Sequence, residues 1–465
     1  MQEDIIKEEL TKRRMPVILA IAIFMQMLDS TILNTSLPAI AKDLNESPLD
    51  MQNAIVSYVL TLALFMPVSG FLADKFGTKR IFIFALIIFA IGSILCSASQ
   101  SLTHLVIARV IQGVGGSLMT PVGKLALIKT FKKNELMVAM NYAIIPALIG
   151  PVLGPLVGGY LVEYFSWHWV FLINIPIALT GIYLSLRFMP NYYSEVIDFD
   201  LKGFLIFASA SLSLSVAIEA LGNAKNITPV LLTFLTGFML MYYYFQHAKR
   251  DNNPIFPYNL FQVRTFRVGI LGNLATRLGI SSISLLLPLM IQLAYHQSTV
   301  VSGWIVAPMA LTAMFGKTIA IKVLKLLGFW TTLMLNTFII GVLICCLAIP
   351  NINTSIYWYI PIICLLGFFN TIQFTAMNSI SIADLRSYHT SSGNSLLSVN
   401  QQLAIGFGIS FGLIVLKLFE DSSIVQGQII TAFRYTFLTM GIITILSGLV
   451  FRRLQANDGE NMQAT

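Results

Sequence analysis

The feature that most limits how this chain can fold is its repeated long apolar segments. Runs of about 18 or more apolar residues recur along all 465 residues, and each can cross a hydrocarbon core about 30 Å thick. Only 11% of the residues are charged, against about 25% in a typical soluble domain, and the mean hydropathy is +0.78. The sequence therefore predicts an all-α polytopic membrane protein without an additional soluble domain.

Fourteen transmembrane segments are predicted, and their short connections make neighbouring helices antiparallel. They cover residues 15–37, 51–72, 80–99, 103–126, 138–162, 167–188, 201–221, 228–248, 268–292, 300–322, 329–349, 355–377, 391–416 and 430–451. Two polar connections, at 187–203 and 247–267, flank only the seventh and eighth segments. We therefore expect a six-helix bundle over residues 1–190, an inserted helix pair with its linkers over 191–266, and a second six-helix bundle over 267–465.

Lysine and arginine are distributed unevenly between the connections. When alternate connections are assigned to opposite faces, 23 of the 29 lie on the face that holds the N-terminus. Positive charge gathers on the cytoplasmic side of membrane proteins, so both termini are expected inside the cell. The net charge of +8 follows these connections and forms no separate basic domain, so nucleic acid is not an expected partner.

The stretch GFLADKFGTKR is the most specific local signal. Its Gly70 allows close approach of helices, and Asp74 can cap the following helix or pair with Lys79 or Arg80 across the loop. Together with Gly77, these residues resemble the signature loop between the second and third helices of the major facilitator superfamily.

Further stretches support this resemblance, in the order that the family requires. LVIARVIQGVGGS resembles the fourth-helix motif, whose arginine is Arg109, and LDSTILNTSLPAI resembles the first-helix motif of the fourteen-helix drug:proton antiporter branch. The fifth-helix antiporter motif is matched by GPVLGPLVGGYL, with Gly150, Pro151, Gly154, Pro155, Gly158 and Gly159. SWHWVFLINIP, SYVLT and SSGNSLLS resemble the MdtD-type multidrug transporters. His168 departs from the arginine that many family members have between the two tryptophans.

An aspartate and an arginine fall inside predicted spans at matching depth. At 1.5 Å per residue, Asp29 lies about 21 Å from the inner end of the first span and Arg109 about 9 Å from the outer end of the fourth. Charges in a membrane are costly and usually pair. Burial disfavours the charged carboxylate and the arginine favours it, so Asp29 is the expected proton-coupling group and Arg109 its modulator. A purely structural ion pair is the alternative.

Further residues are candidates for a substrate-binding site. Arg277 lies near the middle of the ninth span, where it can contact an anionic substrate, Asp29 or backbone carbonyls. Polar side chains inside the spans can line a central site or form bonds between helices: Gln26, Asn34, Tyr58, Gln112, Asn370, Gln373, Asn400 and Gln401.

The resemblance implies a major facilitator fold and a proton-coupled exporter in a bacterial inner membrane, with protons, a small molecule and the lipid bilayer as partners. An importer or uniporter of the same fold is the rival. The five histidines are scattered and match no catalytic motif, so an enzyme is not expected. No cofactor or metal site is expected either, and the sequence leaves open whether accessory periplasmic efflux proteins take part.

The charge balance inside the spans bears on the substrate. One deep acid and two arginines, Arg109 and Arg277, would suit an organic anion or a metal–organic-acid chelate at least as well as a cationic drug. Both substrate classes are therefore kept as expectations.

Overall fold

The computed structural model describes residues 2–195, 198–222, 226–386, 389–423, 425, 427–455 and 458–459. Within these ranges the chain consists of helices and their connections, with no β-strand. The all-α prediction is therefore confirmed, and its cause is that a helix satisfies its backbone hydrogen bonds without water. The helices form two compact units, one of Met1–Asp198 with Ser298–Gly303 and the other of Phe199–Gln297 with Trp304–Thr465.

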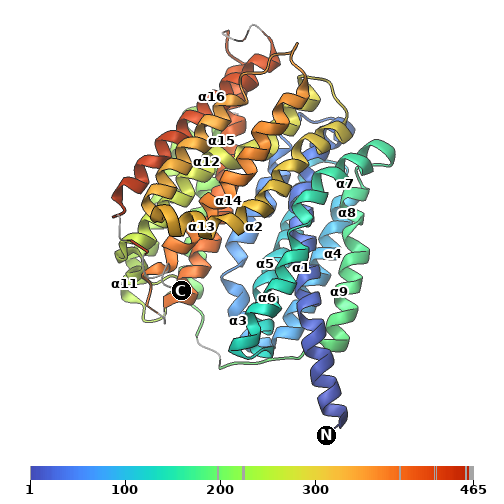
Figure 1. Ribbon diagram of the computed structural model, residues 1–465, viewed down its shortest axis with the longest axis vertical. Helices are drawn as coiled ribbons and strands as arrows, with labels where there is room; N and C mark the ends of the chain where they lie inside the picture. Colours follow the sequence, from blue (N-terminus) through green and yellow to red (C-terminus); the bar gives the residue numbers. More distant parts are fainter. Residues whose placement is uncertain are drawn as a thin grey trace. The chain divides into compact units, whose positions relative to one another are not determined.

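The first unit is drawn in blue to green in Figure 1. Its helices are α1 (Gln2–Leu44), α2 (Gln52–Phe65), α3 (Val68–Phe76), α4 (Thr78–Ser97), α5 (Leu102–Thr130), α6 (Lys133–Ala147), α7 (Gly150–Tyr164), α8 (Trp169–Leu172) and α9 (Asn174–Phe188). Helix α1 packs against α5, α6, α7 and α9, while α5 also packs against α2 and α4. Helices α1 and α5 therefore bring most of this unit into contact.

The second unit is drawn in yellow-green to red. Its elements are α10 (Leu201–Leu221), α11 (Ile227–Arg250), η1 (Tyr258–Gln262), α12 (Arg264–Leu293), α13 (Thr299–Cys346, from Trp304 onward), η2 (Ile356–Trp358), α14 (Tyr359–Ala383), α15 (Thr390–Glu420), α16 (Ile429–Ser447) and η4 (Gly448–Arg453). Helix α12 packs against α14, α15 and α16. The contacts of α10 and α11 group them with this compact unit. The division of the chain into two six-helix bundles and an inserted helix pair remains a prediction.

Two breaks interrupt the helices, one inside the expected span 51–72 and one between two expected spans. Between α2 and α3 the axis bends by 57°, because Pro67 has no N–H with which to continue the helical hydrogen bonds. In α13 the backbone of Gly328 is non-helical, with φ 73° and ψ 169°, a conformation that glycine adopts at little cost. Gly328 thus separates the expected spans 300–322 and 329–349.

Among the described residues, twelve helices are long and apolar enough to cross a membrane, or up to thirteen if the bent α2–α3 pair is one span. This number counts α13 once, although it has 48 residues and is divided at Gly328. The multi-pass prediction is confirmed. The total of fourteen spans and the cytoplasmic placement of both termini remain predictions.

Candidate functional site

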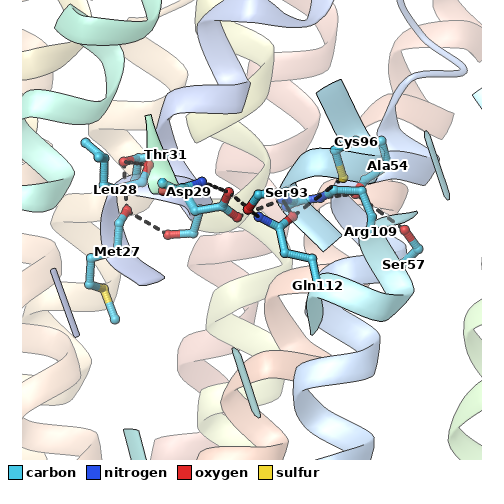
Figure 2. A network of polar contacts seen from close by, with 12 residues as sticks. Met27, Leu28, Asp29, Thr31, Ala54, Ser57, Ser93, Cys96, Arg109 and Gln112 are labelled. Atoms are coloured by element: carbon cyan, nitrogen blue, oxygen red, sulfur yellow. Dashed lines mark hydrogen bonds and ion pairs between the residues drawn. The ribbon is translucent and has the colours of Figure 1, made fainter. Parts of the chain in front are cut away.

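A buried ion pair joins two helices of the first unit. Asp29 of α1 and Arg109 of α5 are each only 1% exposed, and Arg109 Nη1 donates to Asp29 Oδ2 at 2.7 Å. Figure 2 shows the two side chains pointing toward each other from their helices. The pairing predicted from their matching depth is therefore confirmed.

Three side chains donate hydrogen bonds to the carboxylate of Asp29. Besides Arg109, Gln112 Nε2 donates to Oδ1 at 2.8 Å and Asn174 Nδ2 donates to the same oxygen at 3.0 Å. All three donors are almost completely buried. A carboxylate that accepts several bonds, one of them charge-assisted, is well compensated for its removal from water.

The guanidinium of Arg109 has its own set of partners. Its Nε donates to the carbonyl of Ala54 in α2 at 3.0 Å, and its Nη1 also donates to Gln112 Oε1 at 2.6 Å. The ring of Tyr58 lies against the guanidinium, 4.0 Å from its carbon to the ring centroid. Arg109 thus joins α5 to both α1 and α2.

Gln112 extends the network to α4. Its Nε2 donates to Ser93 Oγ at 2.9 Å, as Figure 2 shows. This contact requires α4 and α5 to approach closely, and Gly92 permits it: a Cβ at Gly92 would lie 2.5 Å from the Cα of Gln112. The described network therefore spans α1, α2, α4, α5 and α9.

Other candidates in the first unit lie in the same helices. Gln26 is 4% exposed and its Oε1 accepts a bond from Thr120 Oγ1 at 2.5 Å. Asn34 is 8% exposed, and both its Oδ1 and the hydroxyl of Tyr58 are buried without a hydrogen-bond partner among the described residues. Gln26 therefore links α1 to α5, whereas Asn34 and Tyr58 hold unused polar atoms.

The antiporter motif of α7 packs along the turn of α1 that carries Asp29. A Cβ at Gly150 would lie 3.1 Å from the backbone nitrogen of Leu28, and a Cβ at Gly158 would lie 2.6 Å from the carbonyl oxygen of Ile32. Gly154 faces Thr31 of the same turn. These glycines let the two backbones approach closely.

The rest of the motif has separate roles. Pro151 stands in the first turn of α7, where a missing N–H costs nothing. The carbonyl of Pro155 accepts a bond from Thr35 Oγ1 of α1 at 3.4 Å. Gly159 lies against the start of α13, where Thr299 Oγ1 donates to the Gly159 carbonyl at 3.0 Å.

The signature loop differs from its expected contacts. Asp74 pairs with Lys129 of α5 at 3.4 Å, not with Lys79 or Arg80, and no side chain caps α4. Gly70 faces open space, since a Cβ there would meet nothing within 4 Å. Among the described residues, no helix therefore makes the close approach that Gly70 would allow.

A segment after α9 runs across this loop. Lys79 Nζ donates to the carbonyl of Leu186 at 2.7 Å, and its backbone N–H donates to Asn191 Oδ1 at 3.0 Å. Gly77 has a φ of 93° and lies against the side chain of Asn191. Arg80 is exposed. Hydrogen bonds thus join the loop to the segment that follows α9.

Candidates in the second unit are mostly bonded to neighbouring helices. Gln373 is fully buried, donates to Thr337 Oγ1 at 2.8 Å and accepts from Asn336 at 3.1 Å. Asn400 donates to the carbonyl of Ile270 at 3.1 Å. These contacts tie α14 to α13 and α15 to α12.

The remaining candidates of the second unit are Gln401, Asn370 and Arg277. Gln401 donates to Asn378 Oδ1 at 2.7 Å, whereas Asn370 Oδ1 is buried without a partner among the described residues. Arg277 is 9% exposed and donates through Nε to Asn273 Oδ1 at 2.7 Å. Among the described residues, Gln401 and Arg277 thus each form one side-chain hydrogen bond, and the amide oxygen of Asn370 forms none.

Among the members of the ion-pair network that sequence reasoning missed are Asn174 and Ser93. Asn174 lies in the quoted stretch SWHWVFLINIP, and a lone amide inside an apolar segment was its available signal. Ser93 offered no signal, because serine is common in membrane helices. Both were missed because helix rotation, which decides which side chains meet, is not readable from depth.

Comparisons with known proteins show the family of this chain. Residues 19–409 match the family model of the Major Facilitator Superfamily. The protein named "Putative multidrug resistance protein MdtD" of Pectobacterium atrosepticum is 39% identical over 442 residues, 94% of each chain. "Probable transport protein HsrA" of Haemophilus influenzae is 39% identical over 445 residues, 96% of each chain.

Solved structures share the fold at low sequence identity. A crystal structure of a POT peptide transporter in complex with sulfate gives a TM-score of 0.70 at 14% identity, covering 96% of this chain and 95% of that one. The nucleoside transporter NupG gives 0.67 at 12% identity, covering 94% and 99%. With the family match, these findings identify a transporter and not an enzyme. The chain belongs to the Major Facilitator Superfamily and is related to its MdtD-type members.

Proposed function

We propose that this protein is a proton-coupled exporter that moves small molecules out across a bacterial inner membrane by alternating access. The observation that carries the proposal is the carboxylate of Asp29, which is 1% exposed inside a membrane unit and bonded to Arg109. Ionisable groups in such positions mark proton and substrate pathways. The printed names of the relatives, which describe multidrug resistance and transport, support export of small molecules.

Protonation of Asp29 would change the charge balance of the network. The neutral acid no longer compensates Arg109, which keeps the Ala54 carbonyl, the Gln112 oxygen and the Tyr58 ring as partners. Breaking a buried ion pair by neutralising one partner costs about 3–5 kcal/mol. A free energy of this size can shift a two-state equilibrium by about a hundredfold or more. Proton binding can thus favour a different arrangement of α1 and α5.

Close packing of α7 on α1 gives a route by which this change reaches other helices. The glycines Gly150 and Gly158 leave little space between the two backbones. A shift of α1 near Asp29 therefore moves α7 with it. Antiport requires that proton binding at one group shifts the arrangement of other helices in this way.

The test is proton flux in proteoliposomes that contain the full-length protein and a pH-sensitive dye. Candidate substrates are added to the wild type and to Asp29→Asn at equal protein content. We expect substrate-dependent proton movement in the wild type and its loss in the variant.

Asp43→Asn is the matched control, because Asp43 lies on the same helix and, among the described residues, accepts one side-chain bond, from Trp167 Nε1 at 2.8 Å, which an amide oxygen can keep. It is expected to retain flux. Full coupled flux in Asp29→Asn would show that Asp29 is a structural ion-pair partner and not the coupling group.

A further inference from the structure

Arg277 of α12 is a buried cation without an acidic partner among the described residues. It is 9% exposed, and its one hydrogen bond to the described chain is donated by Nε to Asn273 Oδ1 at 2.7 Å. An unpaired charge is costly inside a membrane. The other deeply buried arginine, Arg109, has its charge compensated by a carboxylate 2.7 Å away. Arg277 therefore requires another explanation.

The guanidinium of Arg277 is held in a fixed orientation by two contacts. Its carbon lies 3.5 Å from the ring centroid of Phe374 in α14, so its flat face is covered. The bond from Nε to Asn273 fixes rotation in the plane of the group. Stacking and an Nε contact leave the edge that carries Nη1 and Nη2 free to donate. Neither of these atoms has a hydrogen-bond partner in the described part of the chain.

A further donor lies beside this edge without an acceptor. Asn273 is fully buried, its Oδ1 is occupied by Arg277, and its Nδ2 has no hydrogen-bond partner among the described residues. A buried donor without an acceptor is costly unless a ligand supplies one. Arg277 and Asn273 together thus present unused donors and a positive charge, which is the chemistry of a site for an oxyanion.

The charge and shape of the site favour a carboxylate. A planar fork of two N–H groups matches the two oxygens of a carboxylate or a phosphate. A carboxylate carries one negative charge and neutralises one arginine, whereas a phosphate group carries about −1.5 to −2 and would leave excess charge in the membrane. The ring of Phe374 adds an apolar surface beside the fork.

We propose that Arg277, positioned by Asn273 and Phe374, binds the carboxylate of a transported organic monoanion. This proposal rests on the proposed export function for its physiological meaning, but the binding itself can be measured without transport. It assigns a substrate class to the second unit, where the sequence left an anion, an aspartate and backbone carbonyls as alternative partners of Arg277.

The experiment measures binding to the purified full-length protein in detergent. Thermal stabilisation is followed by tryptophan fluorescence as benzoate, 1-naphthoate or decanoate is added, each compared with its uncharged amide and with inorganic phosphate. We expect at least one carboxylate to stabilise the wild type in a saturable way, and its amide not to.

Two variants test whether the carboxylate binds at Arg277. Arg277→Gln should weaken carboxylate binding about 10- to 100-fold, as expected for loss of a charge-assisted bond. Arg434→Gln is the matched control: it removes one arginine of the same unit, whose Nε donates to the Ala348 carbonyl at 2.6 Å, and it should bind as the wild type does. Because no acidic residue in the described part of the chain pairs with Arg277, Arg277→Gln should fold, and its melting curve without ligand checks this.

Three results would overturn the proposal. They are equal carboxylate affinity in the wild type and Arg277→Gln, stabilisation by phosphate but by no carboxylate, and no stabilisation of the wild type by any of the three carboxylates. Failure of the export proposal has a different signature. In that case the carboxylate still binds through Arg277, while no compound moves protons in proteoliposomes.

Discussion

The Asp29–Arg109 pair gives a quantitative prediction that follows from its burial. Asp29→Asn and Arg109→Gln each leave one charge without its partner at a position that is 1% exposed. Breaking a buried pair in this way costs about 3–5 kcal/mol of the free energy of unfolding. If the two effects were independent, the double variant would lose about 6–10 kcal/mol, the sum of two such losses.

The structure predicts that the two effects are strongly coupled. The double variant contains no buried charge at this site, and only hydrogen bonds are lost. We expect it to be about 1–3 kcal/mol less stable than the wild type, the cost of a small number of imperfect buried bonds. The coupling free energy should therefore be at least about 3 kcal/mol.

The assay is unfolding of the purified protein by SDS titration in mixed micelles, followed by circular dichroism for the wild type, both single variants and the double variant. A second cycle on Asp74 and Lys129 serves as control, because that pair is 3.4 Å apart with side chains 32% and 23% exposed. Exposed pairs of this kind couple by less than about 1 kcal/mol. Equal coupling in both cycles, or additive losses at Asp29 and Arg109, would refute the reasoning from burial.

Three further outcomes are expected. Gly158→Ala should reduce folded protein and coupled flux, because its Cβ would lie 2.6 Å from a backbone oxygen of α1, whereas Gly70→Ala meets nothing within 4 Å and should match the wild type by size-exclusion chromatography. Asn174→Leu should impair substrate-driven proton flux more than binding of substrate, since it removes a donor to Asp29; unchanged flux would exclude a positioning role. Gly77→Ala should lower the free energy of unfolding by about 1–3 kcal/mol, as φ is 93° there, and an unchanged SDS midpoint would contradict this.

Much of the fold followed from hydropathy and spacing. The apolar segments predicted the helices because an unsolvated backbone has few other ways to satisfy its hydrogen bonds. The pairing of Asp29 with Arg109 followed from depth alone, since helical rise converts residue number into distance across the membrane. These predictions needed only the length and direction of each helix.

Features that depend on helix rotation or on distant chain segments were not predictable in this way. Asn174 donates to Asp29 because α9 turns that face toward α1, and Lys129 replaces Lys79 as the partner of Asp74 because α5 extends past the loop. The non-helical backbone at Gly328, by contrast, falls in the predicted connection between two spans. To predict a contact between two helices, one must know which face each helix turns toward the other.

The burial of Asp29 by its hydrogen-bond donors has a consequence for the rate of proton uptake. If Asp29 is the coupling group, its carboxylate, which is 1% exposed and bonded to three donors, takes up a proton from water only when neighbouring helices separate. The rate of proton uptake is then set by the frequency of that opening, not by proton diffusion. Turnover should accordingly show the steep temperature dependence of a collective helix motion, and a solvent isotope effect close to unity.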